Sequence, residues 1–305
     1  MTVQTNAPAA AMSLKDWSLL TFLAALWGGS FFFARIAVAE LHPLTLVLLR
    51  VAIAALALNL YLLATGRSLG AARGLVPAFF VMGLLNNIVP FSLMFAGQTE
   101  LGAGMASVLN ATTPFWTIML AAALGSGEKT GWNKVAGILL GIAGTAVMMA
   151  PGVLAGLGGP VWAKFALIGT AVSYACAALY ARRLRGVAPA LIATGQLTAS
   201  TVVMVPLVAI LLGKSWMPAS VSSQAWTSVV ALALLCTSFG YILFFRLMAS
   251  AGAVNTSLVT LIVPVFAMLL GGAFLGERLE TFEIAGMILV GFGLLVIDGR
   301  LFGRR

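Results

Sequence analysis

Ten apolar segments, each close to 20 residues long, occupy most of this chain and limit what it can fold into. The polar stretches between them are short, as in TGRSLGAARG at 65–74 and GSGEKTGWN at 125–133. A helix that crosses a bilayer needs about 20 apolar residues. We therefore predict an all-α membrane protein with ten transmembrane helices, at 17–39, 43–64, 75–97, 103–124, 134–151, 161–181, 190–213, 225–248, 253–275 and 281–300.

The composition agrees with lipid as the solvent. Hydrophobic residues make up 61% of the chain and charged residues 8%, with a mean hydropathy of +1.08, whereas soluble domains are about 25% charged. The net charge of +9 does not indicate nucleic-acid binding, because the basic residues form no dense stripe and lie mostly at the ends of apolar segments. Cys176 and Cys236 are interpreted as reduced thiols inside helices, and residues 1–16 as a short cytoplasmic tail.

Part of the sequence occurs twice, 150 positions apart. Residues 102–115 read GAGMASVLNATTPF and residues 252–265 read GAVNTSLVTLIVPV. Four identities carry this match, since Gly102, Ala103, Ser107 and Pro114 recur as Gly252, Ala253, Ser257 and Pro264. After a slip of one residue, Glu128, Gly137 and Gly144 recur as Glu277, Gly286 and Gly293. A duplication identifies the structural unit, so we predict five-helix repeats at 17–151 and 152–303.

The basic residues predict how the helices are oriented. Twelve of them fall at the N-terminus, at the even-numbered connections or at the C-terminus: Lys15, Arg67, Arg73, Lys129, Lys134, Arg182, Arg183, Arg185, Arg246, Arg300, Arg304 and Arg305. Four fall on the other side, namely Arg35, Lys164, Lys214 and Arg278, and Arg50 lies within a helix. The positive-inside rule then places both termini in the cytoplasm, and we predict a multi-pass protein of a bacterial-type inner membrane.

Because five is odd, the second repeat must enter the membrane from the face opposite to the first. Inverted repeats recur in secondary transporters, where the two halves exchange conformations around a site at the midplane. Duplication retained only for packing is the alternative. The fourth and fifth helices of each repeat match best, so we expect them to form a frame around a site in the other helices.

Polar and aromatic side chains at helical spacing predict a cavity between the repeats. The candidate substrate contacts are Trp27, Arg50, Asn86, Asn87, Phe91, Gln98, Asn110, Trp116, Tyr174, Thr237, Ser238, Tyr241 and Thr260. The candidate hinges are Pro90, Pro114 and Pro264, because proline kinks a membrane helix. The alternatives are that serine and threonine bridge helices, that Trp116 faces lipid, and that the repeated glycines allow close packing within the chain or in a dimer.

Arg50 is the one basic residue deep inside a predicted helix. It follows Pro43 by seven residues, which puts it about 10 Å below the outer boundary at 1.5 Å per residue. Its side chain could reach back to that boundary or pair with Glu100. It could instead bind a substrate carboxylate, which suits the guanidinium fork. Gln196 stands at the matching position of the second repeat, so the two repeats do not offer the same anion site.

Acidic residues lie at or near the predicted helix ends: Asp16, Glu40, Glu100, Glu128, Glu277, Glu280, Glu283 and Asp298. Proton-driven pumps commonly relay protons through carboxylates or histidines inside the membrane, and the only histidine, His42, precedes Pro43 in a connection. We therefore predict transport without a buried carboxylate relay. An enzyme would need a nucleophile with a base, a metal cluster or a cofactor loop, so we predict no catalytic residue, metal or cofactor.

Several of these residues resemble a known family. Leu26-Trp27-Gly28, with Ser30-Phe31, Arg35, Pro43 and Arg50 after it, resembles the start of an EamA-type repeat of the drug/metabolite transporter superfamily. The end of that repeat is resembled by Gly102-Ala103, Ser107, Pro114, Glu128 and Gly137, with second copies that include Gly276-Glu277-Arg278. The resemblance covers about 17–298. It implies a small-metabolite exporter, similar to the ten-helix amino-acid exporters of the YddG type.

Together these observations predict an inner-membrane exporter of small metabolites that works by alternating access. Amino acids, including aromatic and other apolar ones, are the expected substrates. A multidrug or nucleobase-type exporter is the alternative, although cationic drugs would find no buried carboxylate. A channel or a membrane scaffold is a further alternative. The expected partners are the substrate and membrane lipid, without nucleic acid, and the expected state is a monomer or weak homodimer.

Overall fold

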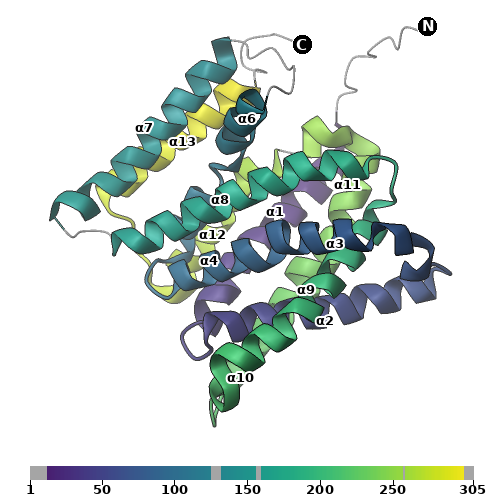
Figure 1. The fold of residues 1–305 in the computed structure, drawn as a ribbon. Coiled ribbons are helices and arrows are strands. Elements are labelled where there is room, and N and C mark those ends of the chain that lie inside the picture. Colours follow the sequence, from purple (N-terminus) through teal and green to yellow (C-terminus); the bar gives the residue numbers. More distant parts are fainter. Residues whose placement is uncertain (1–11, 125–131, 156–158, 257, 299–305) are drawn as a thin grey trace, which may run out of the picture.

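The computed structural model describes residues 12–124, 132–155, 159–256 and 258–298, and within these ranges all regular structure is helical (Figure 1). The first half contains α1 (Leu14–Ala37), α2 (Pro43–Ala64), η1 (Leu69–Leu75), α3 (Val76–Gly83), η2 (Leu84–Ile88), α4 (Val89–Gln98), α5 (Ala103–Asn110), α6 (Thr113–Ala123) and α7 (Trp132–Ala155). The second half contains α8 (Val161–Ala181), η3 (Arg182–Leu184), α9 (Pro189–Leu212), η4 (Gly213–Trp216), α10 (Ser223–Ala231), η5 (Leu232–Phe239), α11 (Gly240–Thr256), α12 (Val259–Leu275) and α13 (Thr281–Asp298).

Six helical stretches among the described residues are long and apolar enough to cross a membrane. They are Leu14–Ala37, Pro43–Ala64, Ala72–Gln98, Val161–Leu184, Pro189–Trp216 and Ser223–Gly252. Three shorter apolar helices lie at Val135–Met148, Val259–Leu275 and Thr281–Ile297. The chain is thus a helical multi-pass membrane protein, and the count of ten spans stays a prediction.

The fourth apolar segment differs from the expected continuous helix at 103–124. It forms two helices, α5 and α6, that are separated at Ala111 and Thr112. Pro114 lies in the first turn of α6, where its missing N–H group leaves no helical hydrogen bond unmade. The proline favours a break here because it would remove one helical hydrogen bond if the helix ran through it. It does not require the break, since the matching Pro264 lies inside α12.

The main helix contacts recur when the two halves of the chain are exchanged. α1 packs on α12, and its counterpart α8 packs on α5 and α6. α4 packs on α8, as η5, α10 and α11 pack on α1. Two helices also pack directly on their own counterparts in the other half: α2 on α9, and α7 on α13. A two-fold relation between the repeats produces such reciprocal contacts, while the inversion itself stays a prediction.

α7 and α13 lie side by side (Figure 1), and glycines allow their backbones to approach closely. A Cβ atom on Gly144 would lie 2.6 Å from the carbonyl oxygen of Gly286, and a Cβ atom on Gly286 would lie 2.6 Å from that of Gly144. Gly137 and Gly293 stand in the same relation, at 2.6 and 2.7 Å. The repeated glycines therefore allow close packing between the two repeats of one chain, as expected for small residues in membrane helices.

A π-helical turn occurs at the same place in both halves. In the first, the Val89 N–H group donates to the carbonyl oxygen of Leu84, five residues back. In the second, the Gly240 N–H group donates to Leu235, also five residues back. Pro90 follows the first turn and lacks the N–H group that an α-helix would use there. Single π turns inside helices frequently mark functional sites.

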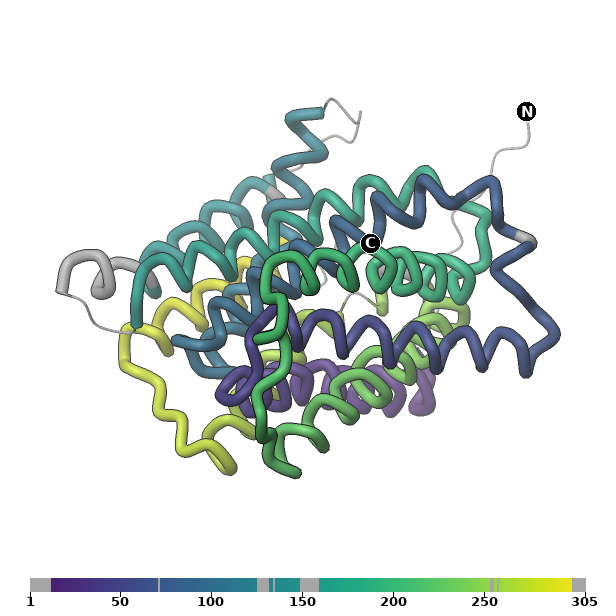
Figure 2. The backbone as a smooth tube through the Cα atoms, turned by 60° about the horizontal axis from the view of Figure 1, so that its bottom comes forward, coloured from purple at the N-terminus to yellow at the C-terminus, as the bar shows by residue number. Residues whose placement is uncertain are grey.

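The helix connections gather at two ends of the molecule (Figure 2). The connections after α1, η4 and α12 lie at one end, and those after α2 and α8 lie at the other. At the first end a polar groove of about 620 Å³ includes Arg35, Glu40, Glu100, Glu277 and Arg278. This distribution agrees with helices that cross in alternate directions. Which end faces the cytoplasm stays a prediction from the charges.

Glu277 closes the start of α5 from the opposite end of the sequence. Its two carboxylate oxygens accept hydrogen bonds from the Ala103 N–H group at 2.8 Å and the Gly104 N–H group at 3.2 Å. A Cβ atom on Gly102 would lie 2.7 Å from the Glu277 carboxyl carbon, so glycine leaves room for the cap. The repeated glycine-alanine pair and the repeated glutamate are therefore parts of one contact. The matching Glu128 lies outside the described residues.

Removal of this cap should destabilise the protein. We expect Glu277→Ala to cost about 1–3 kcal/mol, because two N–H groups at a helix start lose a charged acceptor. Glu277→Gln keeps one acceptor and should cost less. Thermal unfolding of the purified protein in detergent measures both, and Glu280→Ala, which removes an exposed carboxylate nearby, is the matched control. Equal melting temperatures for Glu277→Ala and Glu280→Ala would contradict the role of the cap.

Candidate functional site

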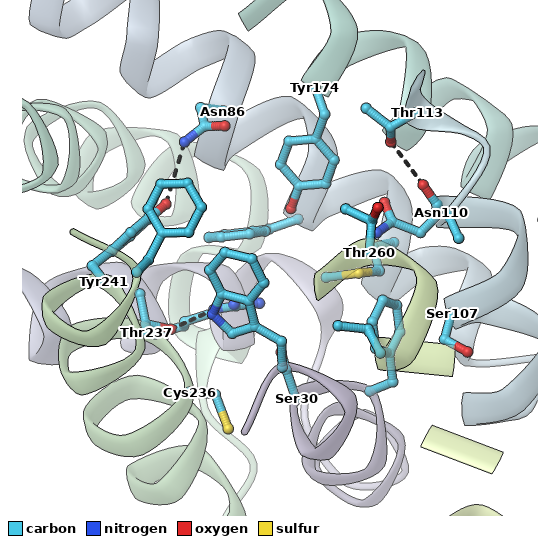
Figure 3. A pocket seen from close by; sticks show the side chains of 18 residues that line it. Ser30, Asn86, Ser107, Asn110, Thr113, Tyr174, Cys236, Thr237, Tyr241 and Thr260 are labelled. Atoms are coloured by element: carbon cyan, nitrogen blue, oxygen red, sulfur yellow. Dashed lines mark hydrogen bonds between the residues drawn. The ribbon is translucent and has the colours of Figure 1, made fainter. Parts of the chain in front are cut away.

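A cavity of about 330 Å³ lies where the broken helix and the two π turns meet (Figure 3). Its wall is formed by Trp27, Ser30, Phe31, Arg50, Asn86, Phe91, Met94, Ser107, Asn110, Ala111, Thr113, Tyr174, Cys236, Thr237, Tyr241, Phe244, Thr260 and Val263. Both repeats contribute, and the described wall includes no residue of α7 or α13. The fifth helices of the two repeats, α7 and α13, thus lie outside the described wall, as expected for a frame around the site. The same expectation does not fit the fourth helices, because α5, α6 and α12 contribute to the wall.

Nine of the thirteen candidate residues lie on this wall: Trp27, Arg50, Asn86, Phe91, Asn110, Tyr174, Thr237, Tyr241 and Thr260. They come from nine helical elements in the two halves of the chain. Their role in substrate contact stays a prediction. Their gathering around one space is the arrangement that such a role requires.

The other four candidates are directed elsewhere, and hydrogen bonds account for each. Asn87 donates to the Ser200 hydroxyl at 3.0 Å, and Gln98 donates to the Phe31 carbonyl oxygen at 2.8 Å. Ser238 donates to the Ala233 carbonyl oxygen at 3.0 Å, and the Trp116 indole donates to the Thr112 hydroxyl at 3.1 Å. These side chains make helix–helix or local contacts, and none of them forms part of the described cavity wall.

The repeat offset could have found Cys236 from the candidate Asn86, and it also pairs wall residues that were not among the candidates. Shifting Asn86, Met94 and Thr113 by 150 positions gives Cys236, Phe244 and Val263, all of which lie on the wall. The same shift relates Phe91 to Tyr241 and Asn110 to Thr260. The remaining wall residues outside the candidate list are Ser30, Phe31, Ser107 and Ala111. Small or apolar residues such as these have no sequence signal that separates them from packing residues.

Arg50 is buried at the cavity, with 6% of its surface exposed. Its Nε donates to the Thr237 hydroxyl at 3.0 Å, and its guanidinium carbon lies 3.7 Å from the centre of the Phe91 ring. Its Nη1 atom is buried and has no hydrogen-bond partner among the described residues. Glu100, the alternative partner, lies instead in the polar groove at one end. Arg50 is thus directed at the cavity, and the described wall offers it no acidic partner.

The residue that matches Arg50 in the second repeat has a different set of contacts. Gln196 is 3% exposed and accepts a hydrogen bond from the Asn86 side chain at 3.2 Å. Asn86 also donates to the Tyr241 hydroxyl at 3.2 Å (Figure 3). Arg50 and Gln196 each reach a π turn of the other repeat, because Thr237 belongs to η5 and Asn86 to η2. The side-chain amide of Gln196 is thus hydrogen-bonded to its neighbours, whereas the guanidinium of Arg50 keeps an unused donor, Nη1.

Aromatic rings form much of the remaining wall. Trp27 stacks on Phe244 with ring centroids 5.4 Å apart. A Cβ atom on Gly240 would lie 2.9 Å from the Trp27 indole nitrogen, so this glycine lets the ring approach η5. The described wall includes no acidic side chain. The cavity therefore combines one cation, hydroxyl and amide groups, and flat apolar surfaces.

The candidate hinges lie beside the cavity or its irregular turns. Pro90 follows η2, and its carbonyl oxygen accepts a hydrogen bond from the Thr170 hydroxyl at 3.2 Å. Pro114 starts α6 after the break. Pro264 lies inside α12, next to the wall residue Val263. Kinks and hinge motion at these prolines stay predictions.

Comparison with known proteins gives the family. The sequence profile described as the EamA-like transporter family matches residues 16–150 and again residues 161–298. The uncharacterized transporter YvbV of Bacillus subtilis is 27% identical over 288 residues, which cover 92% of this chain and 90% of that protein. A probable terminal-alkyne amino-acid exporter of Streptantibioticus cattleyicolor is 27% identical over 297 residues, which cover 96% of each chain.

A protein of known crystal structure has the same fold. It aligns with a TM-score of 0.64 over 95% of this chain and 99% of its own, at 22% sequence identity. The two family matches together span most of the chain, and they fall on its two halves as the duplicated motifs do. The chain therefore belongs to the EamA-like transporter family of the drug/metabolite transporter superfamily and is a membrane transporter.

Proposed function

We propose that this transporter exports small metabolites with a carboxylate group, amino acids first among them, and that Arg50 binds the carboxylate. The observation that carries the proposal is the buried Nη1 atom of Arg50, which lies at the cavity without a partner. A buried donor that lacks a partner is costly, and more so when it is charged. A substrate carboxylate would satisfy it with a charge-assisted hydrogen bond.

The rest of the cavity supports a small substrate with an apolar part. Its volume of about 330 Å³ is near the lower end for small-molecule sites, which run from about 300 to 1,000 Å³. Trp27, Phe91 and Phe244 offer ring surfaces to an aromatic or aliphatic side chain. The name of the Streptantibioticus relative, an amino-acid exporter, fits the same class.

Alternating access is the transport mechanism that we propose. The cavity lies between two matching halves, and each half places irregular backbone there: the α5–α6 break and η2 in one, and η5 in the other. Non-helical backbone at membrane depth is tolerated where it lines a cavity, and discontinuous helices form the sites of many secondary transporters. Bending at these places would open the cavity to one side at a time.

Counterflow into proteoliposomes tests the proposed function. Vesicles with the purified protein are loaded with an unlabelled L-amino acid, and entry of the labelled amino acid is measured against amino acids, their decarboxylated amines and nucleobases. We expect saturable exchange that amino acids inhibit at much lower concentrations than the other two classes do. Flux that rises linearly with concentration would indicate a channel-like path, and absence of exchange across the panel would contradict the proposed substrate class. Equal inhibition by amines would remove Arg50 from its role.

We further expect transport to need no proton gradient, because no acidic side chain lies on the described cavity wall and proton pumps commonly use intramembrane carboxylates. At a fixed substrate gradient, an imposed pH difference of one unit should change the initial rate less than about twofold. Vesicles without protein give the background. Strong acceleration by the pH gradient would show a proton path that this cavity does not provide.

A further inference from the structure

A second buried polar atom at the cavity has no partner, and it is an acceptor. The side-chain oxygen Oδ1 of Asn110 is buried without a hydrogen-bond donor among the described residues, and Asn110 lies on the cavity wall. Arg50 Nη1 and Asn110 Oδ1 are therefore an unused donor and an unused acceptor of one cavity. Two other buried oxygens without partners, in Asn87 and Gln98, belong to side chains that are not on this wall.

The break between α5 and α6 places Asn110 there. Asn110 is the last residue of α5, and carbonyl groups at a helix C-terminus have partial negative charge. Nearby hydroxyls are used by the backbone, since Thr113 donates to the Asn110 carbonyl oxygen at 2.7 Å and Thr112 donates to that of Leu109 at 2.6 Å. Half-helix C-terminal ends favour cations in transporter sites. This side of the cavity therefore suits a positively charged donor.

The two unused atoms belong to different sides of the cavity. Figure 3 shows Thr237, which binds Arg50, on the side opposite Asn110, with Tyr174 between them. Thr260, which matches Asn110 in the second repeat, appears on the same side of this view as Asn110. A molecule that joins an anionic and a cationic group over a short distance would complement both sides at once.

We infer that Asn110 accepts a hydrogen bond from the α-ammonium group of the substrate, so that the cavity selects zwitterionic α-amino acids over simple carboxylates. The inference rests on the proposed function, in which Arg50 binds the carboxylate. A neutral amide can hold the ammonium group without a formal negative charge that would pair with Arg50 itself. Asn110 is then a specificity-determining residue.

The test compares three ligands that differ by one group each. Counterflow of labelled L-phenylalanine is inhibited with unlabelled L-phenylalanine, 3-phenylpropanoate or 2-phenylethylamine, in the natural protein and in Asn110→Leu, Asn110→Asp and Asn59→Leu. Asn59 is the matched control because its amide binds the Ala55 carbonyl oxygen and the Thr198 hydroxyl, away from the wall. All measurements are made with sodium and with choline as the bulk cation.

In the natural protein and in Asn59→Leu we expect L-phenylalanine to bind at least about tenfold more tightly than 3-phenylpropanoate, as for a hydrogen bond to a charged group. Asn110→Leu should lose this preference and bind 3-phenylpropanoate as before. Asn110→Asp, which is close to asparagine in shape, should keep phenylalanine and weaken 3-phenylpropanoate, because its carboxylate repels an anion and attracts an ammonium group.

Three results would overturn the inference. A preference that survives in Asn110→Leu places the ammonium group elsewhere. Equal binding of phenylalanine and 3-phenylpropanoate by the natural protein shows a carboxylate site without an amino subsite, and leaves the proposed function standing. Binding that falls tenfold in choline assigns Asn110 to a sodium ion. If no carboxylate ligand inhibits at all, the proposed function itself fails.

Discussion

Arg50→Gln will bind carboxylate substrates at least about 30-fold more weakly than the natural protein, because loss of one partner from a buried charge pair costs about 2 kcal/mol or more. Glutamine is still able to reach the Thr237 hydroxyl, which the arginine Nε contacts at 3.0 Å. The substitution therefore removes the charge and the free Nη1 donor while keeping a polar side chain. Arg50→Lys keeps the charge but loses the planar fork, so we expect an intermediate loss.

The measurement is the half-inhibitory concentration of each ligand in counterflow, with amino acids and their decarboxylated amines side by side. We expect the amino acids to lose affinity and the amines to change by less than about twofold, because they have no carboxylate for Arg50 to bind. Arg246→Gln is the matched control, since Arg246 is exposed on α11 and lies outside the cavity wall. Equal losses for amino acids and amines in Arg50→Gln would assign Arg50 to the structure of the cavity alone.

Gly28→Ala will lower stability and alter the cavity together. A Cβ atom at Gly28 would lie 2.6 Å from Phe266 Cβ, 2.8 Å from the Val263 carbonyl oxygen and 2.9 Å from the Ala267 nitrogen. These are backbone or near-backbone atoms of α12, so no side-chain rotation relieves the contact. The two helices must separate, at a cost of about 1–3 kcal/mol for overpacking.

Gly29 is an unusually close control for this substitution. It is the next residue of α1, and a Cβ atom there would lie 3.6 Å from its nearest neighbour, Phe33, which is ordinary contact. We expect Gly29→Ala to melt within about 1 °C of the natural protein and Gly28→Ala to melt roughly 5 °C lower in detergent. Gly28→Ala should also transport more slowly, because Trp27 and Val263 both line the cavity. Equal melting of the two variants would contradict close packing of α1 on α12.

The sequence predicts the bounds of most helices well, because the length of an apolar segment can be read from neighbouring residues alone. The expected segments at 17–39, 43–64 and 161–181 match α1, α2 and α8 closely. The expected helix at 103–124 was wrong as one continuous element, since Pro114 starts a new helix. The π turns carried no comparable sequence signal. In these turns the N–H groups of Val89 and Gly240 donate to carbonyl oxygens five residues back in the chain.

Which side chains face the cavity cannot be predicted from helical spacing alone. Asn86 and Asn87 are neighbours with the same side chain, yet Asn86 lies on the cavity wall and Asn87 bonds to Ser200. Helical spacing places both within one helix surface and leaves their partners undetermined. The choice depends on α9, which is more than 100 residues away in the chain.

The sequence by itself determined a duplicated bundle of membrane helices and its family, because composition, apolar length and repeated motifs are all written along the chain. It also singled out Arg50, since a charge inside an apolar helix is visible without coordinates. Only the tertiary structure decided that Glu277 caps α5, that Gln196 is already occupied, and that Arg50 and Asn110 keep an unused donor and acceptor at one cavity. Each of these depends on which groups remain unsatisfied after distant helices have packed, and a hydrogen bond between distant segments leaves no periodic pattern in either of them.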